Sequence, residues 1–122
     1  MTSQRQLPLG DLSEVPYFSL DLHARPEQDV VEVLLTGDLD EATVGHLEDG
    51  LAWVIEHLHE RRVVVDLSGT RRVEACGVGA LRRTADALRG TGRHLDVRQG
   101  TGATRLALEA AGLRVVASES EG

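Results

Sequence analysis

Hydrophobic residues follow two different spacings that alternate along most of the chain. Short apolar runs rich in Val and Leu predict five strands, at residues 17–23, 30–36, 62–67, 94–98 and 113–117. Apolar residues spaced three and four apart predict three helices between these strands, at residues 44–58, 77–89 and 103–110. The order β-β-α-β-α-β-α-β implies right-handed crossovers and a largely parallel sheet.

The pattern predicts a single α/β domain over residues 17–117, with a mixed central sheet of four to five strands. The run Val63-Val64-Val65 is continuously apolar, which is typical of a central strand covered on both faces. Residues 1–16 lack apolar periodicity and are expected to form a flexible N-terminal arm. Residues 118–122 form a polar tail.

Each predicted helix has its own end signals and apolar positions. Asp40 or Thr43 can cap the first helix through a side-chain oxygen, whereas Gly45 and Gly50 each weaken it by ~1 kcal/mol. The second helix has an apolar face made by Val78, Leu81, Ala85 and Leu88. Its outward positions are Arg82, Arg83, Asp86 and Arg89. Thr101 can cap the third helix, which extends over Ala103, Leu106, Ala107 and Ala110.

The composition narrows the class of protein. The chain has 122 residues, 41% of them hydrophobic, which argues for one folded domain. Cys76 is the single cysteine, so an internal disulfide is excluded. No apolar run approaches the ~18 residues of a membrane span, and the start of the sequence lacks the apolar stretch of a secretory signal. We therefore expect a cytoplasmic protein without direct membrane insertion.

Charge is unevenly distributed along the sequence. The net charge is −7, and all 13 basic residues are arginine. Residues 1–60 hold two arginines and 13 acidic residues, whereas residues 61–122 hold 11 arginines and seven acidic residues. This asymmetry fits either oriented protein association or two solvated faces of one domain. Nucleic-acid binding is not expected, because the total is acidic and no aromatic residue lies among the arginines.

The most informative segment is the loop at residues 66–77, Asp-Leu-Ser-Gly-Thr-Arg-Arg-Val-Glu-Ala-Cys-Gly. It leaves the carboxyl end of a predicted buried strand and reaches the start of a helix. Open α/β sheets usually bind their ligands at such places. Backbone N–H groups at a helix start also favour a negative group.

At these residues the sequence resembles the STAS domain, as found in bacterial anti-sigma factor antagonists. The resemblance spans about residues 17–117 and rests on Gly-Asp-Leu-Asp at 37–40, Val-Val-Val-Asp-Leu-Ser-Gly at 63–69, Gly-Val-Gly-Ala-Leu at 77–81 and Leu-Glu-Ala-Ala-Gly-Leu at 108–113. It implies helices mainly on one face of the sheet and a binding protein, not an enzyme. Such proteins bind a serine-kinase anti-sigma factor and so release its sigma factor.

The resemblance also implies a switch, from which this sequence departs. In the family, the kinase phosphorylates the second serine of an Asp-Ser-Ser-Gly motif at the start of the second helix, which ends the binding. This chain has Glu74-Ala75-Cys76-Gly77, so Cys76 takes the phosphoacceptor-equivalent position and no hydroxyl is present. We predict that the usual off-switch is missing. Ser68 and Thr70 are the nearby hydroxyls that remain as alternative acceptors.

The partner-binding surface is predicted from the loop, the turn before the first helix and the outer face of the second helix. Its residues are Asp38, Asp40, Ser68, Thr70, Glu74, Ala75, Cys76, Gly77, Arg82 and Arg83. Capping explains the two aspartates equally well, and a solvated helix face explains the two arginines. A homodimer is left open.

Other chemistry has weaker support. Gly77-Val-Gly79 resembles the opening of a dinucleotide loop, but Arg82 stands where the third glycine is required. His57 and His59 lie two apart on a helix and face different ways. We therefore predict no catalytic residue, no metal site and no cofactor.

Two alternatives to the anti-sigma factor antagonist stay open. One is a STAS scaffold or accessory subunit of another complex, stressosome-like or transporter-associated. The other is a thiol-based redox sensor through Cys76. A helix start contributes only ~0.3–1 kcal/mol to a thiolate, and Glu74 opposes any help from Arg71 and Arg72. An inert replacement of serine explains Cys76 as well.

Overall fold

Strands in the order β1-β2-β3-β4-β5-β6 form one mixed sheet in the computed structural model, which describes residues 4–6, 18–98 and 102–116. The strands are β1 (Gln4–Gln6), β2 (Ser19–Arg25), β3 (Val30–Thr36), β4 (Arg62–Gly69), β5 (His94–Arg98) and β6 (Arg114–Val116). The helices are α1 (Val44–His57), α2 (Ala75–Arg89) and α3 (Gly102–Ala110), with a short 3₁₀ helix η2 (Pro26–Gln28). The predicted α/β class and element order are confirmed from β2 onward.

The pairing of the strands follows from the connections between them. β2 and β3 are antiparallel because η2 joins them in a short turn, whereas β3, β4, β5 and β6 are parallel and need the three helices as crossovers. β1 lies within the segment expected to be an arm, and it pairs antiparallel with β2. The five predicted strands therefore gain a short sixth one at the edge.

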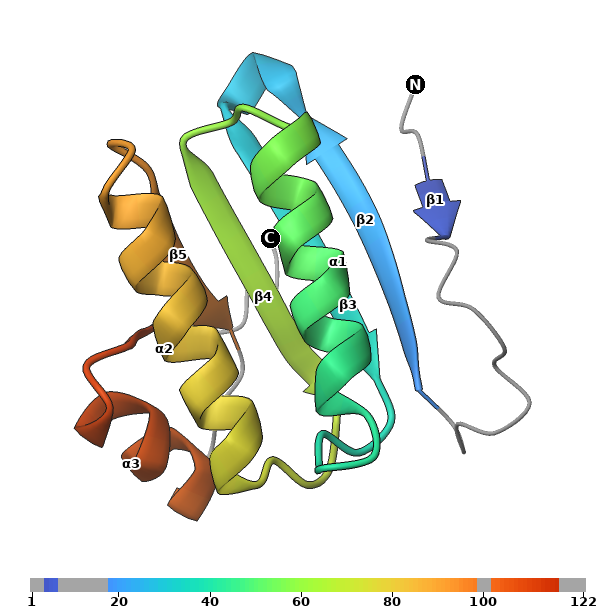
Figure 1. Cartoon of the computed structure of the whole chain (residues 1–122), viewed down its shortest axis with the longest axis vertical. Helices are drawn as coiled ribbons and strands as arrows, with labels where there is room; N and C mark the ends of the chain where they lie inside the picture. The colour runs from blue at the N-terminus through green and yellow to red at the C-terminus, as the bar shows by residue number, and fades with distance from the viewer. Residues whose placement is uncertain (1–3, 7–17, 99–101, 117–122) are drawn as a thin grey trace.

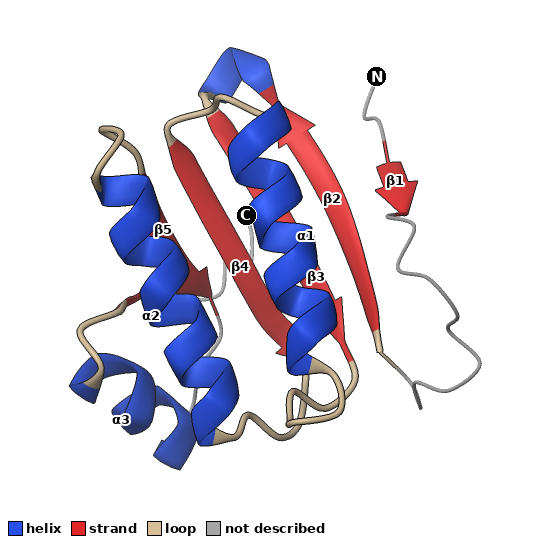
Figure 2. Cartoon of the chain, in the orientation of Figure 1, coloured by secondary structure: helices blue, strands red, loops and turns tan. Residues whose placement is uncertain are grey.

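Helices α1 and α2 cover one face of the sheet (Figure 1; Figure 2). Beneath them lies a core of Leu and Val side chains. Its most buried members include Leu20, Val33, Leu47, Leu51, Val65, Leu81 and Val97. This arrangement confirms the helices on one face, and it fixes the start of each helix at the edge where the preceding strand ends.

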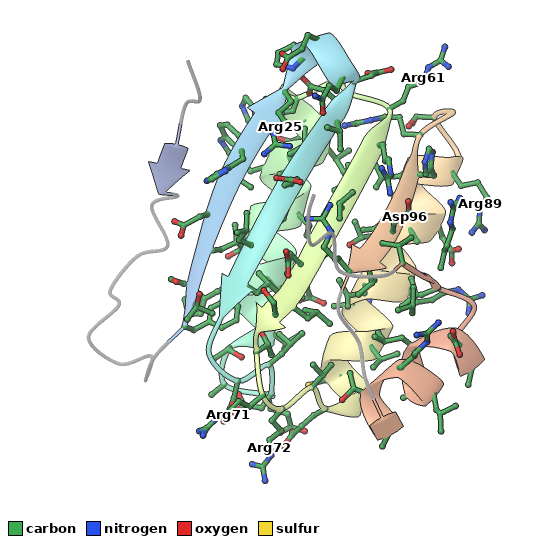
Figure 3. All side chains as sticks on the ribbon, turned by 180° about the vertical axis from the view of Figure 1, so that it is seen from behind. Arg25, Arg61, Arg71, Arg72, Arg89 and Asp96 are labelled. Carbon is green, nitrogen blue, oxygen red and sulfur yellow. The ribbon has the colours of Figure 1, made fainter. Side chains whose placement is uncertain are left out.

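The opposite face of the sheet carries charged side chains, and no described helix covers it (Figure 3). The strand register places four residues in one row: Glu32, Val64, Asp96 and Arg114. Arg98 reaches across β4 to Glu32 at 3.2 Å and to Asp66 at 3.4 Å. Val64 is fully buried on this face. The central strand is thus buried on both faces at Val64, as predicted, and ion-paired side chains lie on the same open face.

Two helices differ from the prediction in detail. α2 begins at Ala75, two residues earlier than expected, so Cys76 lies inside its first turn. α3 packs through Leu108, whereas the predicted apolar positions Ala103, Ala107 and Ala110 are exposed and Leu106 is 67% exposed. The reason is that α3 lies near the end of the sheet and contacts mainly β6. Only a narrow stripe of its side chains therefore faces the core. The proposed cap Thr101 lies outside the described residues.

Candidate docking surface

The predicted binding loop lies at the edge of the sheet where β3 and β4 end. The register between the two strands shifts there: Leu34 pairs with Asp66, but Thr36 pairs with Gly69. The extra residue in β4 is a β-bulge, a feature that bends a strand at the rim of a sheet. Beyond the shift, the Gly37 N–H donates to the Gly69 carbonyl at 3.1 Å. The two chains therefore leave the sheet side by side.

Leu39 joins the two loops that follow these strands. Its N–H donates to the Arg72 carbonyl at 2.8 Å, and its carbonyl accepts the Glu74 N–H at 2.9 Å, which makes a single parallel bridge with Val73. Its side chain is fully buried against Gly77, where an added Cβ would lie 2.6 Å from Leu39 Cγ and Cδ2. Glycine at residue 77 thus allows α2 to start this close to the loop. We call residues 38–40 and 70–76 the docking edge.

The two aspartates of the docking edge have different roles. Asp40 Oδ1 accepts the Ala42 N–H at 3.0 Å, and the Thr43 hydroxyl accepts the Asp40 N–H at 3.0 Å, so both residues order the turn before α1. Thr43 is the N-cap residue of α1 but makes no side-chain capping hydrogen bond, so the predicted cap is not formed. The Asp38 carboxylate makes no hydrogen bond within the described residues. It lines a hollow of about 450 Å³ together with Asp40 and Arg71. Asp38 is therefore available to a donor from outside.

The first turn of α2 presents backbone donors without a side-chain cap. Glu74 is the N-cap residue and makes no capping hydrogen bond. The N–H groups of Ala75 and Cys76 have no backbone acceptor within the described residues. Ala75 is exposed and Cys76 is half-buried. A helix start with unsatisfied N–H groups attracts an acceptor or an anion.

Arg71 and Arg72 add positive charge beside this turn. Both are exposed and form no ion pair within the described part of the chain. Figure 3 shows both pointing away from the molecule at one end, with Arg61 at the opposite end. Sequence spacing does not indicate the exposure of these two arginines, which were predicted only as neighbours of Cys76.

Arg82 and Arg83 lie about two turns further along α2, roughly 10 Å from Ala75. Both side chains are exposed, as predicted, but each is held within the protein. Arg83 contacts Glu48 of α1 at 2.6 Å, and Arg82 donates to the Ala111 carbonyl at 2.6 Å. These arginines therefore connect α2 to α1 and to the residue that follows α3. A binding partner would have to compete with these contacts.

Two of the residues predicted to bind the partner, Ser68 and Gly77, lie next to the docking edge. Gly77 is buried, because its contact with Leu39 lies inside the core. Ser68 is exposed and lies at the β-bulge near the end of β4. Thr70 stays on the edge and is half-buried, with its hydroxyl 3.4 Å from the Leu35 carbonyl that accepts from it.

Metal binding and membrane insertion find no structural support in the described segments. Within residues 4–6, 18–98 and 102–116, no three His, Cys, Asp or Glu residues are grouped so that they could hold a metal ion. No helix in those ranges has the length and apolarity that crossing a membrane requires. Cys76 is a free thiol.

A mixed α/β sheet with helices α1 and α2 on one face is the architecture of a STAS domain. A family model described as "Mlab, STAS domain" matches residues 22–117, and the chain belongs to this family. No curated protein matches the chain in sequence.

Solved structures show the same fold at low sequence identity. The Bacillus anti-sigma factor antagonist SpoIIAA, in its unphosphorylated form, is 16% identical with a TM-score of 0.68, over 84% of this chain and 89% of that chain. An anti-sigma factor antagonist from Mycobacterium paratuberculosis is 20% identical with a TM-score of 0.67, over 93% of this chain and 85% of that chain. The murine Slc26a9 anion transporter is 11% identical with a TM-score of 0.57, over 90% of this chain and 18% of that chain.

Proposed function

We propose that this protein is an anti-sigma factor antagonist-like regulator, which binds a serine-kinase anti-sigma factor through its docking edge and catalyses no reaction. The observation that carries the proposal is the uncapped first turn of α2, exposed at Ala75 and fixed in place by Leu39. Its place in the STAS family and its likeness to SpoIIAA support a role in protein binding.

The charges of the docking edge indicate what a partner must offer. The N–H groups of Ala75 and Cys76, together with Arg71 and Arg72, favour carboxylate or carbonyl acceptors. On the other side of the edge, Asp38 favours a basic residue. A partner segment that carries an acidic residue near a basic one is complementary to both.

The regulation differs from that of the family. Phosphorylation adds about −1.5 to −2 charges and would oppose an acidic partner at this helix start. Ala75 and Cys76 supply no hydroxyl to receive the phosphoryl group. Binding to the partner is therefore constitutive. Its extent depends on the abundance of the protein or on a chemical group elsewhere in it.

A kinase assay tests this regulation directly. The protein and the serine-kinase anti-sigma factor that co-purifies with it are incubated with ATP, and binding is then measured by calorimetry alongside phosphopeptide mass spectrometry. We expect the wild type to stay unmodified and bound, whereas Cys76→Ser gains a phosphate and loses binding. Ala75→Ser is the matched control, since its hydroxyl lies one residue away from the acceptor position. A phosphate on wild-type Ser68 or Thr70, accompanied by loss of binding, would contradict the missing switch.

A charge-reversal experiment tests the location of the surface. Arg71→Glu/Arg72→Glu should weaken partner binding by about tenfold or more, because two exposed cations are replaced by repelling charges. Arg61→Glu is the control, because Arg61 is equally exposed but lies at the opposite end of the molecule (Figure 3). Equal binding by all three proteins would place the partner elsewhere.

A transporter-associated subunit is the second candidate function. It is favoured by the likeness of this fold to a segment of the murine anion transporter. Affinity purification followed by mass spectrometry separates the two functions, since the first yields a kinase with its sigma factor and the second yields transporter components.

A further inference from the structure

A second charged region lies on the open face of the sheet. Arg25 of β2, Arg62 of β4 and Arg98 of β5 line a hollow of about 410 Å³. Glu32 is the single acidic residue among the described residues of the lining, which also include Gln28 and Val30. These described residues, three arginines and one glutamate among them, carry a charge of +2.

The hollow offers more N–H donors than its carboxylates use. Arg62 contacts Asp96 through Nε at 2.8 Å, and its two terminal nitrogens have no hydrogen-bond partner among the described residues. Arg98 binds Glu32 and Asp66 through its terminal nitrogens, while its buried Nε has no partner in the described part of the chain. Arg25 shares Glu32 at 3.4 Å and is 41% exposed. Arg25 of β2 and Arg62 of β4 therefore bring unused guanidinium donors to the hollow, and Arg98 of β5 adds its positive charge.

We propose that this hollow binds a phosphate dianion, either inorganic phosphate or the phosphate group of a small monoester. The planar donor fork of arginine matches phosphate oxygens in a bidentate manner. A charge of −2 also neutralises the lining. Asp66 and Asp96 contact the arginines from outside the lining, so they hold the guanidinium groups in place and moderate their attraction.

This site is separate from the docking edge. Arg62 begins β4, whereas the docking edge follows the carboxyl end of the same strand. The hollow also opens on the face opposite to α1 and α2. A phosphate ligand can therefore occupy it while a partner is bound, and this proposal does not rest on the proposed function.

A titration followed by nuclear magnetic resonance tests the proposal. Isotope-labelled full-length protein receives inorganic phosphate in one series and glycerol 3-phosphate in a second, with ionic strength held constant by sodium chloride. We expect saturable shifts in the backbone and arginine side-chain signals of Arg25, Arg62 and Arg98. Tighter binding of glycerol 3-phosphate would assign the site to a monoester, and equal or weaker binding would assign it to free phosphate.

Three variants are expected to differ in how tightly they bind phosphate. Arg25→Gln should weaken binding about tenfold, because a charge-assisted hydrogen bond is lost while only an exposed ion pair is broken. Glu32→Gln should tighten binding by several-fold, because the single carboxylate among the described residues of the lining disappears. Arg61→Gln, next to the hollow in sequence but outside its lining, should bind as the wild type does. Shifts that rise linearly without saturation, or Arg25→Gln binding as tightly as Arg61→Gln, would overturn the proposal.

Discussion

The two faces of the sheet are stabilised by different interactions. Under α1 and α2, closely packed Leu and Val side chains are almost fully buried. On the opposite face, four arginines and three acidic residues form two separate groups of ion pairs. The same strands supply both faces, because successive side chains alternate. In β4, Val63 and Val65 enter the core, while Arg62 and Asp66 face the other way.

The two faces therefore contribute differently to the stability of the fold. Removing a buried apolar group loses its transfer free energy and leaves a cavity. A solvent-exposed ion pair contributes only about 0–1 kcal/mol, and the loss is larger where a buried charge such as Asp96 is left unpaired. We therefore expect the helix-covered face to fix the fold and the docking edge, and substitutions of charge on the open face to cost less than truncations in the core. Substitutions on each face test this expectation.

Leu39→Ala should have the largest effect. Leu39 is fully buried between the docking edge and the start of α2. Its truncation should lower the free energy of unfolding by about 2–5 kcal/mol. Urea denaturation followed by the fluorescence of Trp53, the single tryptophan, measures the change.

Leu106→Ala is the control for this truncation. The same atoms are removed from a side chain that is 67% exposed, so the change should stay within about 0.5 kcal/mol. Similar losses for the two variants would show that burial on the helix-covered face does not decide stability.

The elements of the fold were predictable because burial imposes a period on the sequence. β3 and β4 were found within two residues of their ends, since turn residues bound their apolar runs. β1 was missed because Gln4–Gln6 has no apolar residue, so only its pairing with β2 defines it. The face of α3 was missed because Leu106 and Leu108 are equally apolar, and the position of the helix beside β6 decides which of them is buried.

The sequence predicted where the candidate site lies along the chain, but not the tertiary contacts that form it. The sequence located the loop before α2 and the missing hydroxyl at Cys76. It did not indicate that Leu39 pairs with Val73, because this contact joins residues 34 positions apart through a single bridge. The ion pairs of the open face were also missed. Arg98 and Glu32 lie on strands that are not neighbours, and sequence spacing alone does not reveal a side chain reaching across β4.

Gly77→Ala should have the next largest effect. The new Cβ would lie 2.6 Å from two atoms of a buried leucine, so Leu39 or α2 must shift. Such overpacking costs about 1–3 kcal/mol. Gly79→Ala is the matched control in the same helix, where the nearest atom is the flexible Nη1 of Arg83 at 3.4 Å. It should stabilise the protein by up to about 1 kcal/mol, because alanine favours helix. Chemical denaturation of both variants checks the opposite signs, and equal losses would mean that the contact with Leu39 is unimportant.

The smallest loss of stability is expected on the open face. The substitution there tests an ion pair, whereas the substitutions of Leu39 and Gly77 test close packing. Asp96 is almost fully buried, and Arg62 holds its Oδ2 at 2.8 Å, while Arg114 lies 3.7 Å from Oδ1. Arg62→Met should cost about 1–2 kcal/mol, because Asp96 is left with one distant cation. This is less than the loss for a fully buried pair, since Arg62 is 39% exposed.

Adding Asp96→Asn to that variant should recover most of the lost stability, because the isolated buried charge disappears. Asp96→Asn alone should cost less than Arg62→Met alone, because Arg62 can reach water and the asparagine keeps the shape of the side chain. Denaturation of the four proteins of this double-mutant cycle gives the coupling energy. If the changes in the free energy of unfolding simply add, Arg62 stabilises the sheet through the packing of its aliphatic stem. The contrast between a closely packed face and an ion-paired face then fails at this position.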